Sequence, residues 1–462
     1  MARPRRAQSQ PSPSHSLGDE PRAQWRTARG AVRAARHRGV PMQSTDVELE
    51  RLRVRREARR AELAAHSGVN QREGRALCLS GGGYRAALFH LGGLLRLHEA
   101  GLLAGLSLVS SVSGGSIVSA WLACRYLDTR RDRDESFAAW SDRIDFRAEV
   151  VEPFRAVAAR DIRTLPVLAT LPFNWLKPSW RIGLLERGYI RAFGERHLDE
   201  LPECPSFVFC ATDLSFGVNW EFSRRRVGDY LAGYLRDGAR RVRLSCAVAA
   251  SSCFPPVFGP VRFEAAPGDY QRGDYRGDDG DALRARIELS DGGVYDNLAT
   301  EPSLRRYREV LVSDAGGPFV FESKRWWLSR LMRYTQVIGN QAEALRKRLF
   351  FGQAESGSFS GVYWSLTGYR DEGADGYSPA LVREVLGRLR TDLDRFLDVE
   401  FEVLVNHGYF AAHDALWRQN GWVSETSPAV WPYPDRADEN RVRRWLRRSH
   451  ARVLHRRWWG AS

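Results

Sequence analysis

Two stretches of the chain show the same order of apolar and small residues. An apolar run over residues 76–80 ends in three glycines, and leucines then recur at helical spacing until Gly101. Residues 106–112 form a second apolar run, which ends in a serine and two glycines before an apolar helical segment over residues 117–127. Two strand–turn–helix units in succession predict a parallel sheet that is covered by helices on both faces.

Three more apolar runs read as strands, and each ends in a polar or acidic residue. They cover residues 207–212, 286–290 and 310–313. Folds of this kind build their sites at the carboxyl ends of parallel strands. Residues 130–200 and 320–435 are rich in Arg and Trp at helical spacing, which predicts helical insertions or a cap. The fold class is therefore α/β, with a mostly parallel central sheet covered by helices, helical insertions and a helical C-terminal extension.

The pattern divides the chain into five segments. The first mixes Arg, Pro, Ser and Gln without hydrophobic periodicity, which is typical of disorder, and the second is charged with Leu or Val at near-helical spacing. We predict a disordered basic arm (1–45), a charged lead-in helix (46–74), the main α/β domain (75–318), a helical extension or cap (319–435) and a basic amphipathic tail (436–462).

Charge adds a further constraint because it is uneven along the chain. The formal net charge is +14, but residues 1–60 carry +9 and residues 436–462 carry +7, so the intervening body totals −2. A nearly neutral body without a base-reading motif predicts no specific nucleic-acid partner, and binding through the basic ends would be nonspecific and salt-dependent.

The distribution of apolar residues and cysteines bears on location. No uninterrupted run approaches the roughly 18 apolar residues of a membrane-spanning helix, and no apolar segment follows the N-terminal arginines. We therefore predict a cytoplasmic protein that contacts a membrane, if at all, from its surface. The six cysteines form no C-x-x-C pair, so reduced and buried thiols are expected rather than a zinc or redox site.

The junction after the second strand carries the strongest candidate nucleophile. Ser113 follows Ser111 and Val112 and precedes Gly114 and Gly115, so it falls where a strained strand-to-helix turn would expose its hydroxyl. The G-x-S-x-G pattern is met imperfectly, because Ser111 replaces its first glycine. The alternative is that Ser113 is an ordinary turn residue among glycines.

The first junction is a candidate anion site. The backbone N–H groups of Gly81, Gly82 and Gly83 could approach an anion at a helix N-terminus, and Arg85 lies in the same turn. The segment also fits the loose G-x-G-x-x-A dinucleotide fingerprint, but no acid ends the second strand to hold a ribose. No Gly-Lys-Ser/Thr follows, which excludes a phosphate-binding Walker loop. An oxyanion hole remains, beside the alternative that the loop only packs on the sheet.

A nucleophilic serine needs a base, and none of the ten histidines lies in a motif. Asp291 is followed by two glycines and ends a predicted strand, where it could approach the elbow. Asp314, in Ser-Asp-Ala-Gly-Gly, ends another apolar run. We rank Asp291 first, and either acid could instead belong to a structural turn.

Three motifs in this order resemble the patatin-like phospholipase family: SGGGYRAALFHLGGLLRL, SSVSGGSIVSA and DGGVYDN. The resemblance covers roughly residues 75–318, with Ser111 and Ala86 standing where glycine is common. It implies a Ser–Asp dyad of Ser113 and Asp291 without histidine, an oxyanion loop at Gly81–Gly83, and hydrolysis of acyl esters of lipids, of phospholipase A or lysophospholipase type. Neither a metal nor an organic cofactor is required. The alternative is a catalytically weak lipid- or protein-binding module on the same fold.

A lipid substrate also gives the C-terminal tail a candidate role. Val442, Trp445, Leu446 and Val453 fall near one helical face among many arginines, which is typical of a basic amphipathic helix that lies on an anionic membrane. The alternative is a helix that docks its apolar face, together with Trp458 and Trp459, on the body of the protein.

Overall fold

The computed structural model describes residues 73–162, 164, 179–255, 258–318, 327–368, 375–420 and 428–450. The chain divides into two compact units, Met1–Gly68 and Val69–Ser462, and all described residues belong to the second. The predicted basic arm and nearly all of the predicted lead-in helix lie outside the described residues.

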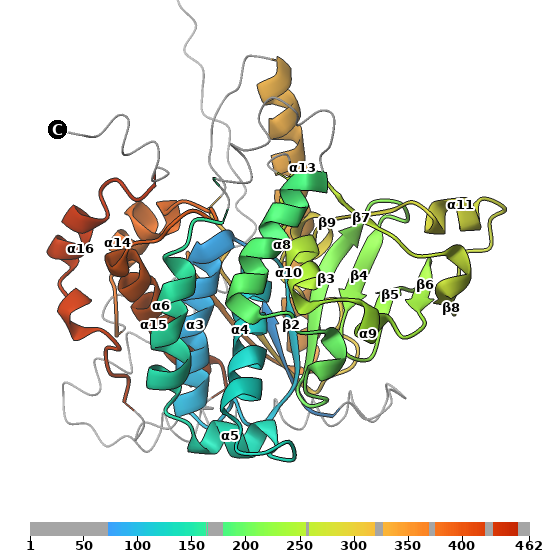
Figure 1. Ribbon diagram of the computed structural model, residues 1–462. Helices are drawn as coiled ribbons and strands as arrows, with labels where there is room; N and C mark the ends of the chain where they lie inside the picture. The colour runs from blue at the N-terminus through green and yellow to red at the C-terminus, as the bar shows by residue number, and fades with distance from the viewer. Residues whose placement is uncertain are drawn as a thin grey trace, which may run out of the picture. The chain divides into compact units, whose positions relative to one another are not determined.

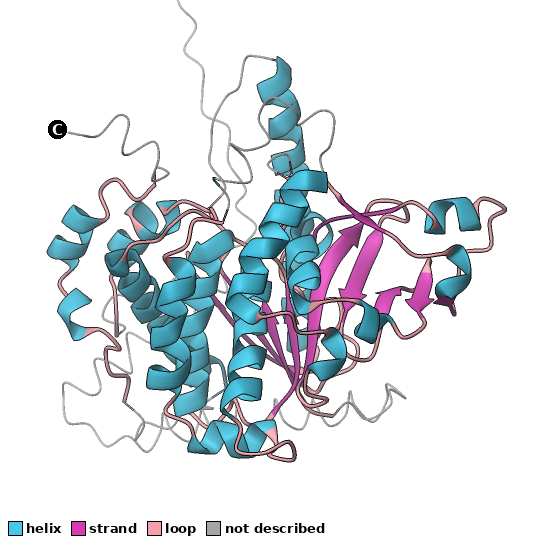
Figure 2. Ribbon diagram, in the orientation of Figure 1, coloured by secondary structure: helices cyan, strands magenta, loops and turns pink. Residues whose placement is uncertain are grey.

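An eleven-stranded mixed sheet forms the centre of the second unit (Figures 1 and 2). Its order is β11-β10-β1-β2-β3-β4-β5-β6-β8, and β9 pairs with both β3 and β7. The strands from β11 to β3 are parallel, whereas all pairings beyond β3 are antiparallel. The bounds are β1 Arg75–Leu79, β2 Leu106–Ser111, β3 Ser206–Asp213, β4 Val218–Phe222, β5 Val227–Asp229, β6 Gly233–Leu235, β7 Val261–Phe263, β8 Tyr270–Gln271, β9 Ile287–Asp291, β10 Glu309–Asp314 and β11 Ser360–Ser365.

Helices cover both faces of the parallel part, as the sequence predicts, and Figure 1 shows α3, α4, α6 and α8 in front of the sheet. Of the strands in the antiparallel half beyond β3, only β9 was predicted, because the others carry little periodic signal. The helix bounds are α3 Gly83–Glu99, α4 Gly114–Thr129, α5 Phe137–Arg143, α6 Glu152–Ala158, α8 Ser179–Phe193, α9 Gly238–Arg241, α10 Leu244–Ser251, α11 Gly280–Arg284, α12 Gly293–Asp296, α13 Trp327–Glu355, α14 Pro379–Glu384, α15 Asp398–Asn420 and α16 Glu439–Trp445.

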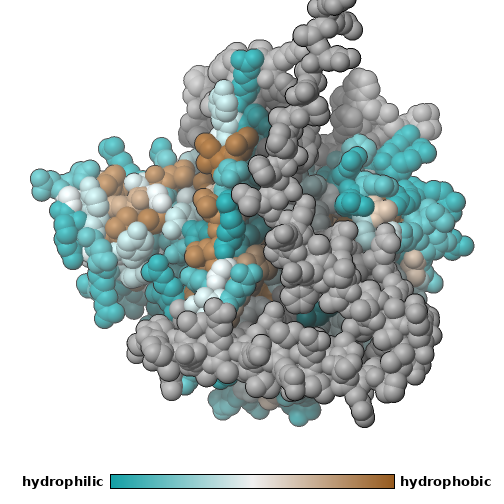
Figure 3. All heavy atoms as spheres, turned by 180° about the vertical axis from the view of Figure 1, so that it is seen from behind, coloured by the Kyte–Doolittle hydropathy of each residue, from teal (hydrophilic) through white to brown (hydrophobic). Residues whose placement is uncertain are grey.

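Helix α13 lies on the opposite face of the sheet. Successive strand residues point to opposite faces, so Cys78, Val310 and Val312 form an apolar cluster with Phe350 of α13, separate from the cluster under α3 and α4. Figure 3 views the molecule from behind, and hydrophobic atoms gather there in a band along α13.

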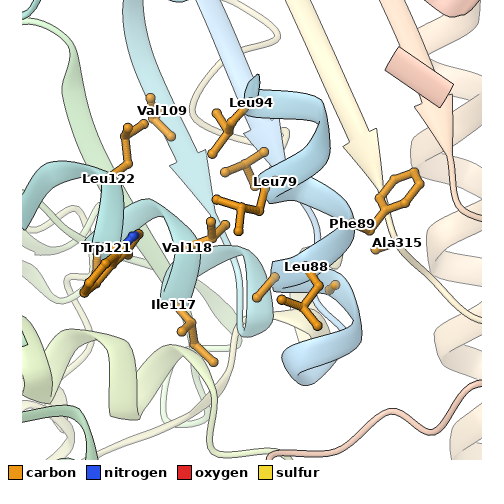
Figure 4. Packing of buried hydrophobic residues seen from close by; sticks show 14 of the residues in the cluster. Leu79, Leu88, Phe89, Leu94, Val109, Ile117, Val118, Trp121, Leu122 and Ala315 are labelled. Carbon is orange, nitrogen blue, oxygen red and sulfur yellow. The ribbon is translucent and has the colours of Figure 1, made fainter. Parts of the chain in front are cut away.

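The larger core joins α3 and α4 to the front of the sheet (Figure 4). Leu79 and Val109 from the strands pack with Leu88 of α3 and with Val118 and Leu122 of α4, and all five are almost fully buried. Burial of each aliphatic side chain of this kind contributes about 1.5–3 kcal/mol to the stability of the fold. These contacts hold the amino ends of α3 and α4 at fixed places above the strands that precede them.

The C-terminal third also contributes to this core, so residues on both sides of the predicted boundary at 318 pack together. Strand β11 extends the parallel sheet beside β10, and α15 packs closely on α3. A Cβ added at Gly408 would lie 1.8 Å from the Phe89 carbonyl oxygen, so only glycine allows this approach. Helices α5 and α6 likewise bury Trp140 and Phe154 in the main core rather than forming a cap.

The described part of the C-terminal tail contains one short helix, α16. Its Val442 and Leu446 side chains are buried in the main core, while Trp445 is partly exposed. Within residues 436–450 the side chains of Val442 and Leu446 therefore pack on the body of the protein, as the docking alternative expects. Val453, Trp458 and Trp459 lie outside the described residues. Among the described helices, none is both long and apolar enough to cross a membrane. No cysteine of the described chain forms a disulfide.

Candidate active site

The ends of β2 and β9 meet along one edge of β3. Strand β4 occupies the other edge of β3, and β2 runs parallel to β3 as far as the pair Ser111–Phe209. Strand β9 approaches from the opposite direction and ends at the pair Asp291–Ala211. The last residues of the two strands therefore lie beside positions only two residues apart on β3. Our expectation that the site collects carboxyl ends of parallel strands was wrong for Asp291, whose strand is antiparallel.

Ser113 occupies a strained turn between β2 and α4. Its φ of 53° and ψ of −118° are costly for a residue with a Cβ, and such conformations persist only where the surrounding structure enforces them. The turn places Ser113 at the N-cap of α4, and the side chain is 8% exposed. A Cβ added at Gly81 would lie 3.2 Å from the Ser113 Cβ, so the first glycine loop lies directly against the serine.

The strain is held by a network that the sequence analysis missed. The Ser113 N–H donates to both the carbonyl oxygen (3.1 Å) and the hydroxyl oxygen (3.0 Å) of Ser251, at the end of α10. The same Ser251 carbonyl accepts the Gly292 N–H at 3.3 Å, so one residue ties the turn of the nucleophile to the residue after Asp291. The only sequence signal was the Ala-Ser-Ser-Cys-Phe stretch, whose serines had no assigned role.

Ser111 belongs to the same network, which explains a hydroxyl where the usual pattern has glycine. Ser116 donates to the Ser111 hydroxyl at 3.2 Å and shares a hydrogen bond of 2.8 Å with the Ser251 hydroxyl. Ser111 in turn donates to the Val208 carbonyl at 3.3 Å. The extra side chain is fully buried and hydrogen-bonded, so it adds contacts to the elbow rather than a clash.

Asp291 lies beside this elbow with half of its carboxyl group unpartnered. The side chain is 1% exposed, and Oδ1 accepts the Gly293 N–H at 2.8 Å. Oδ2 is buried without a hydrogen bond in the described structure. Burial raises the pKa of Asp291 to about 7, whereas the Gly293 N–H and the nearby Ser113 hydroxyl act to lower it. This carboxyl group is therefore close to the serine, dry and poised to accept a proton near neutral pH.

The glycine loop aims backbone donors at the same region. Gly82 has a φ of +136°, which favours glycine, and a Cβ added at Gly114 would lie 2.1 Å from the Gly83 carbonyl oxygen. The two helix N-termini therefore meet beside Ser113. The N–H groups of Gly82, Gly83 and Gly114 have no acceptor among the described residues, whereas the Gly81 N–H donates to the Asn297 carbonyl at 3.1 Å. The free donors suit a developing oxyanion.

Arg85 has a different role from the one expected of it. Its side chain is almost fully buried and donates to the carbonyl oxygens of Leu389 at 2.9 Å and Ala315 at 3.0 Å. Burial lowers its pKa to about 10. The guanidinium therefore joins the start of α3 to the segments after β10 and before α15, and its described contacts do not reach the elbow.

Asp314, the second candidate base, has its negative charge compensated by neighbouring side chains. Its Oδ2 accepts Lys347 Nζ at 2.7 Å and the Tyr363 hydroxyl at 2.5 Å, and Oδ1 accepts the Gly316 N–H at 2.8 Å. Lys347 is the main influence that lowers the pKa of Asp314 despite burial. This acid stays ionised in an ion pair and is poorly suited to take a proton.

The described histidines do not supply a base for Ser113. His90 is bonded to Ser313 and the Ser80 carbonyl, and His407 to the Leu366 carbonyl. None is hydrogen-bonded to Ser113. Among the described residues, no group of three or more His, Cys, Asp or Glu side chains could hold a metal ion.

The chain is similar to one protein family and to solved structures. A model of the patatin-like phospholipase family matches residues 77–304. No curated protein matches the chain. VipD from Legionella pneumophila is 14% identical, with a TM-score of 0.34, over 76% of this chain and 67% of its own. Human GIVD cytosolic phospholipase A2 is 15% identical, with a TM-score of 0.40, over 86% of this chain and 63% of its own.

The matched residues begin in β1 and end shortly after α12. They contain Ser113, Asp291, the glycine loop and Ser251, and they leave out Asp314 and α13. The family match supports hydrolysis of lipid acyl esters in general. The resemblance inferred from the three motifs is confirmed: residues 77–304 match the patatin-like phospholipase family.

Proposed function

We propose that the protein is a serine lipid acyl hydrolase, of phospholipase A or lysophospholipase type, that uses Ser113 and Asp291 as a two-residue catalytic centre. The observation that carries the proposal is the strained elbow serine beside a buried carboxyl group with a raised pKa and an unpartnered oxygen. A nucleophile and its base need this proximity, and the base needs a pKa near the working pH.

In the first half of the reaction, the Ser113 hydroxyl oxygen attacks the acyl carbonyl carbon while Asp291 takes its proton. The N–H groups of Gly82, Gly83 and Gly114 stabilise the negative charge on the carbonyl oxygen. Collapse of the intermediate breaks the ester bond, and the proton on Asp291 passes to the departing alcohol. The acyl group is then bound to Ser113 as an ester.

In the second half, Asp291 takes a proton from a water molecule as its oxygen attacks the acyl-enzyme. The intermediate collapses, the proton returns to the Ser113 oxygen, and the fatty acid leaves. Each half returns Asp291 to its ionised form, so this scheme needs no cofactor.

Labelling with a serine-directed fluorophosphonate tests this proposal. We expect one adduct on native protein by intact mass, mapped to Ser113, and none on Ser113→Ala. An adduct on another serine would refute the assignment. A folded native protein that is not labelled and does not hydrolyse esters, yet binds phospholipid vesicles, would support the alternative of a binding module on the same fold.

A further inference from the structure

Exposed apolar side chains are concentrated on helix α13. Of the 14 large hydrophobic residues that are exposed in the described structure, six lie on this helix. Tyr334, Ile338, Leu345 and Leu349 are 44–68% exposed. At 100° per residue they fall within about 60° of one another, and they form a stripe about 22 Å long. Figure 3 shows the corresponding hydrophobic band. We call these four residues the α13 stripe.

The opposite side of α13 is attached to the catalytic region. Glu343 accepts the Asn297 side-chain N–H at 3.5 Å, and Asn297 provides the carbonyl that holds the Gly81 N–H. Lys347 pairs with Asp314, and the Arg346 guanidinium lies 4.9 Å from the ring centre of Tyr295 in α12, just after Asp291. The stripe is thus carried by the helix that braces the glycine loop and the segment of the catalytic acid.

We propose that the α13 stripe is the surface through which the protein contacts an anionic lipid bilayer. This inference rests on the proposed function, because a lipid hydrolase must meet substrate that is held in a membrane. Lys347 and Arg346 of α13 are paired with Asp314 and Glu301, respectively, on the side away from the stripe. Arg330 and Arg348 are exposed and, at 100° per residue, lie within about 40° of the edge of the stripe, so an anionic surface complements it. Val294, three residues after Asp291, is also exposed and brings apolar surface close to the catalytic segment.

A second copy of the chain fits this surface less well. A helix pair needs apolar residues at alternating three- and four-residue spacing. In α13 this spacing is interrupted, because Gln341 stands three residues after Ile338 and Arg348 stands three residues after Leu345. Two copies would also bring two helices of net positive charge together. The C-terminal tail is another candidate to cover the stripe. The bilayer is favoured over it, because Val442 and Leu446, two apolar residues of the tail, are already buried.

The test measures vesicle binding in a Ser113→Ala background, so that turnover does not alter the vesicles. Vesicles contain equal parts of phosphatidylcholine and phosphatidylglycerol, or phosphatidylcholine alone. We expect Ile338→Asp and Leu345→Asp each to weaken co-sedimentation with the mixed vesicles about tenfold or more, since each replaces an inserted apolar group with a charge. Val430→Asp is the matched control, because Val430 is as exposed as Ile338 (68%) and lies far along the chain.

Unchanged binding in the stripe variants, or an equal loss in Val430→Asp, would overturn the proposal. A native mass of two chains that falls to one in Ile338→Asp would assign the stripe to a second copy instead. With Ser113 intact, Ile338→Asp should hydrolyse a soluble short-chain ester at the native rate. If native protein lacks this hydrolysis, the proposed function fails, and the vesicle result still decides the role of the stripe on its own.

Discussion

Asp291 and Asp314 stand in nearly the same local setting but have opposite electrostatics. Each ends a strand, is at most 2% exposed, precedes small residues, and has an Oδ1 that accepts the N–H two residues later at 2.8 Å. The other oxygen makes the difference. Lys347 and Tyr363 bond to Oδ2 of Asp314, whereas Oδ2 of Asp291 is buried and has no hydrogen bond among the described residues. The pKa is lowered in one and raised to about 7 in the other.

This contrast shows why a strand-end aspartate followed by small residues is not a sufficient mark of a base. The backbone geometry is shared, and the cation that pairs with one of the two acids comes from a separate element, α13. A paired carboxylate serves stability, while an unpaired one costs stability and gains reactivity.

Replacing each acid separately distinguishes their roles, and the largest effect is expected at Asp291. We expect Asp291→Asn to reduce kcat by about 10³-fold, because the serine loses its base and an amide cannot replace it. Folding should be retained, since the change removes a buried charge that has no partner. Steady-state hydrolysis of a soluble ester and a thermal melt measure the two effects. Activity within tenfold of native would contradict the assigned role.

The counterpart is Asp314→Asn, which should affect stability more than chemistry. Removing this carboxylate leaves Lys347 with Glu343 alone, and because Lys347 is partly exposed we expect a loss of about 2 kcal/mol rather than the larger cost of a fully buried pair. Urea unfolding measures it. A folded Asp314→Asn protein that is as inactive as Asp291→Asn would erase the distinction between the two acids.

The two acids also predict opposite dependences of stability on pH. Asp291 has a raised pKa in the folded state, so the unfolded chain loses this proton first, and the native protein loses stability as pH rises from about 4 to 7. Asp314 has a lowered pKa, so its contribution is present above the unfolded value and is lost as pH falls through the folded one. Unfolding curves of native and Asp291→Asn proteins should therefore diverge between pH 4 and 7, with the variant gaining. Parallel curves would argue against a raised pKa.

A smaller effect is expected at Ser251, which acts through Ser113. Ser251→Ala removes one of two acceptors of the Ser113 N–H, and we expect kcat to fall about tenfold while KM stays unchanged. Ser251→Thr keeps a hydroxyl group and should recover most of the loss. A change in KM alone would place Ser251 in substrate binding instead.

The smallest effect is expected for Ser111→Gly, which restores the usual glycine of the elbow. Ser116 keeps its bond to Ser251, so we expect activity within about threefold of native and a stability loss near 1 kcal/mol. Ester hydrolysis and urea unfolding of the native and Ser111→Gly proteins measure the two effects. A large gain in kcat would show that the Ser111 hydroxyl restrains the nucleophile.

Local patterns were enough to predict the first two strand–turn–helix units. Strand periodicity and glycine turns are local, so β1, α3, β2 and α4 lie where the sequence placed them. The contacts of Ser251 and Arg85 join segments more than 100 residues apart, and Lys347 reaches Asp314 from a different element, so no local pattern encodes these contacts. The antiparallel pairing of β9 could not be predicted from a local pattern either. It depends on the part of the β3 edge that β2 leaves unpaired beyond Phe209.

In the proposed mechanism Asp291, rather than Asp314, activates Ser113. The most direct measurement is the rate of fluorophosphonate labelling of Ser113 as a function of pH in native, Asp291→Asn and Asp314→Asn proteins. We predict that the rate rises with pH through a midpoint of about 7 in the native and Asp314→Asn proteins, because the base must be ionised. Asp291→Asn should label very slowly at every pH. A pH-independent native rate, or Asp291→Asn labelling at the native rate, would contradict the claim.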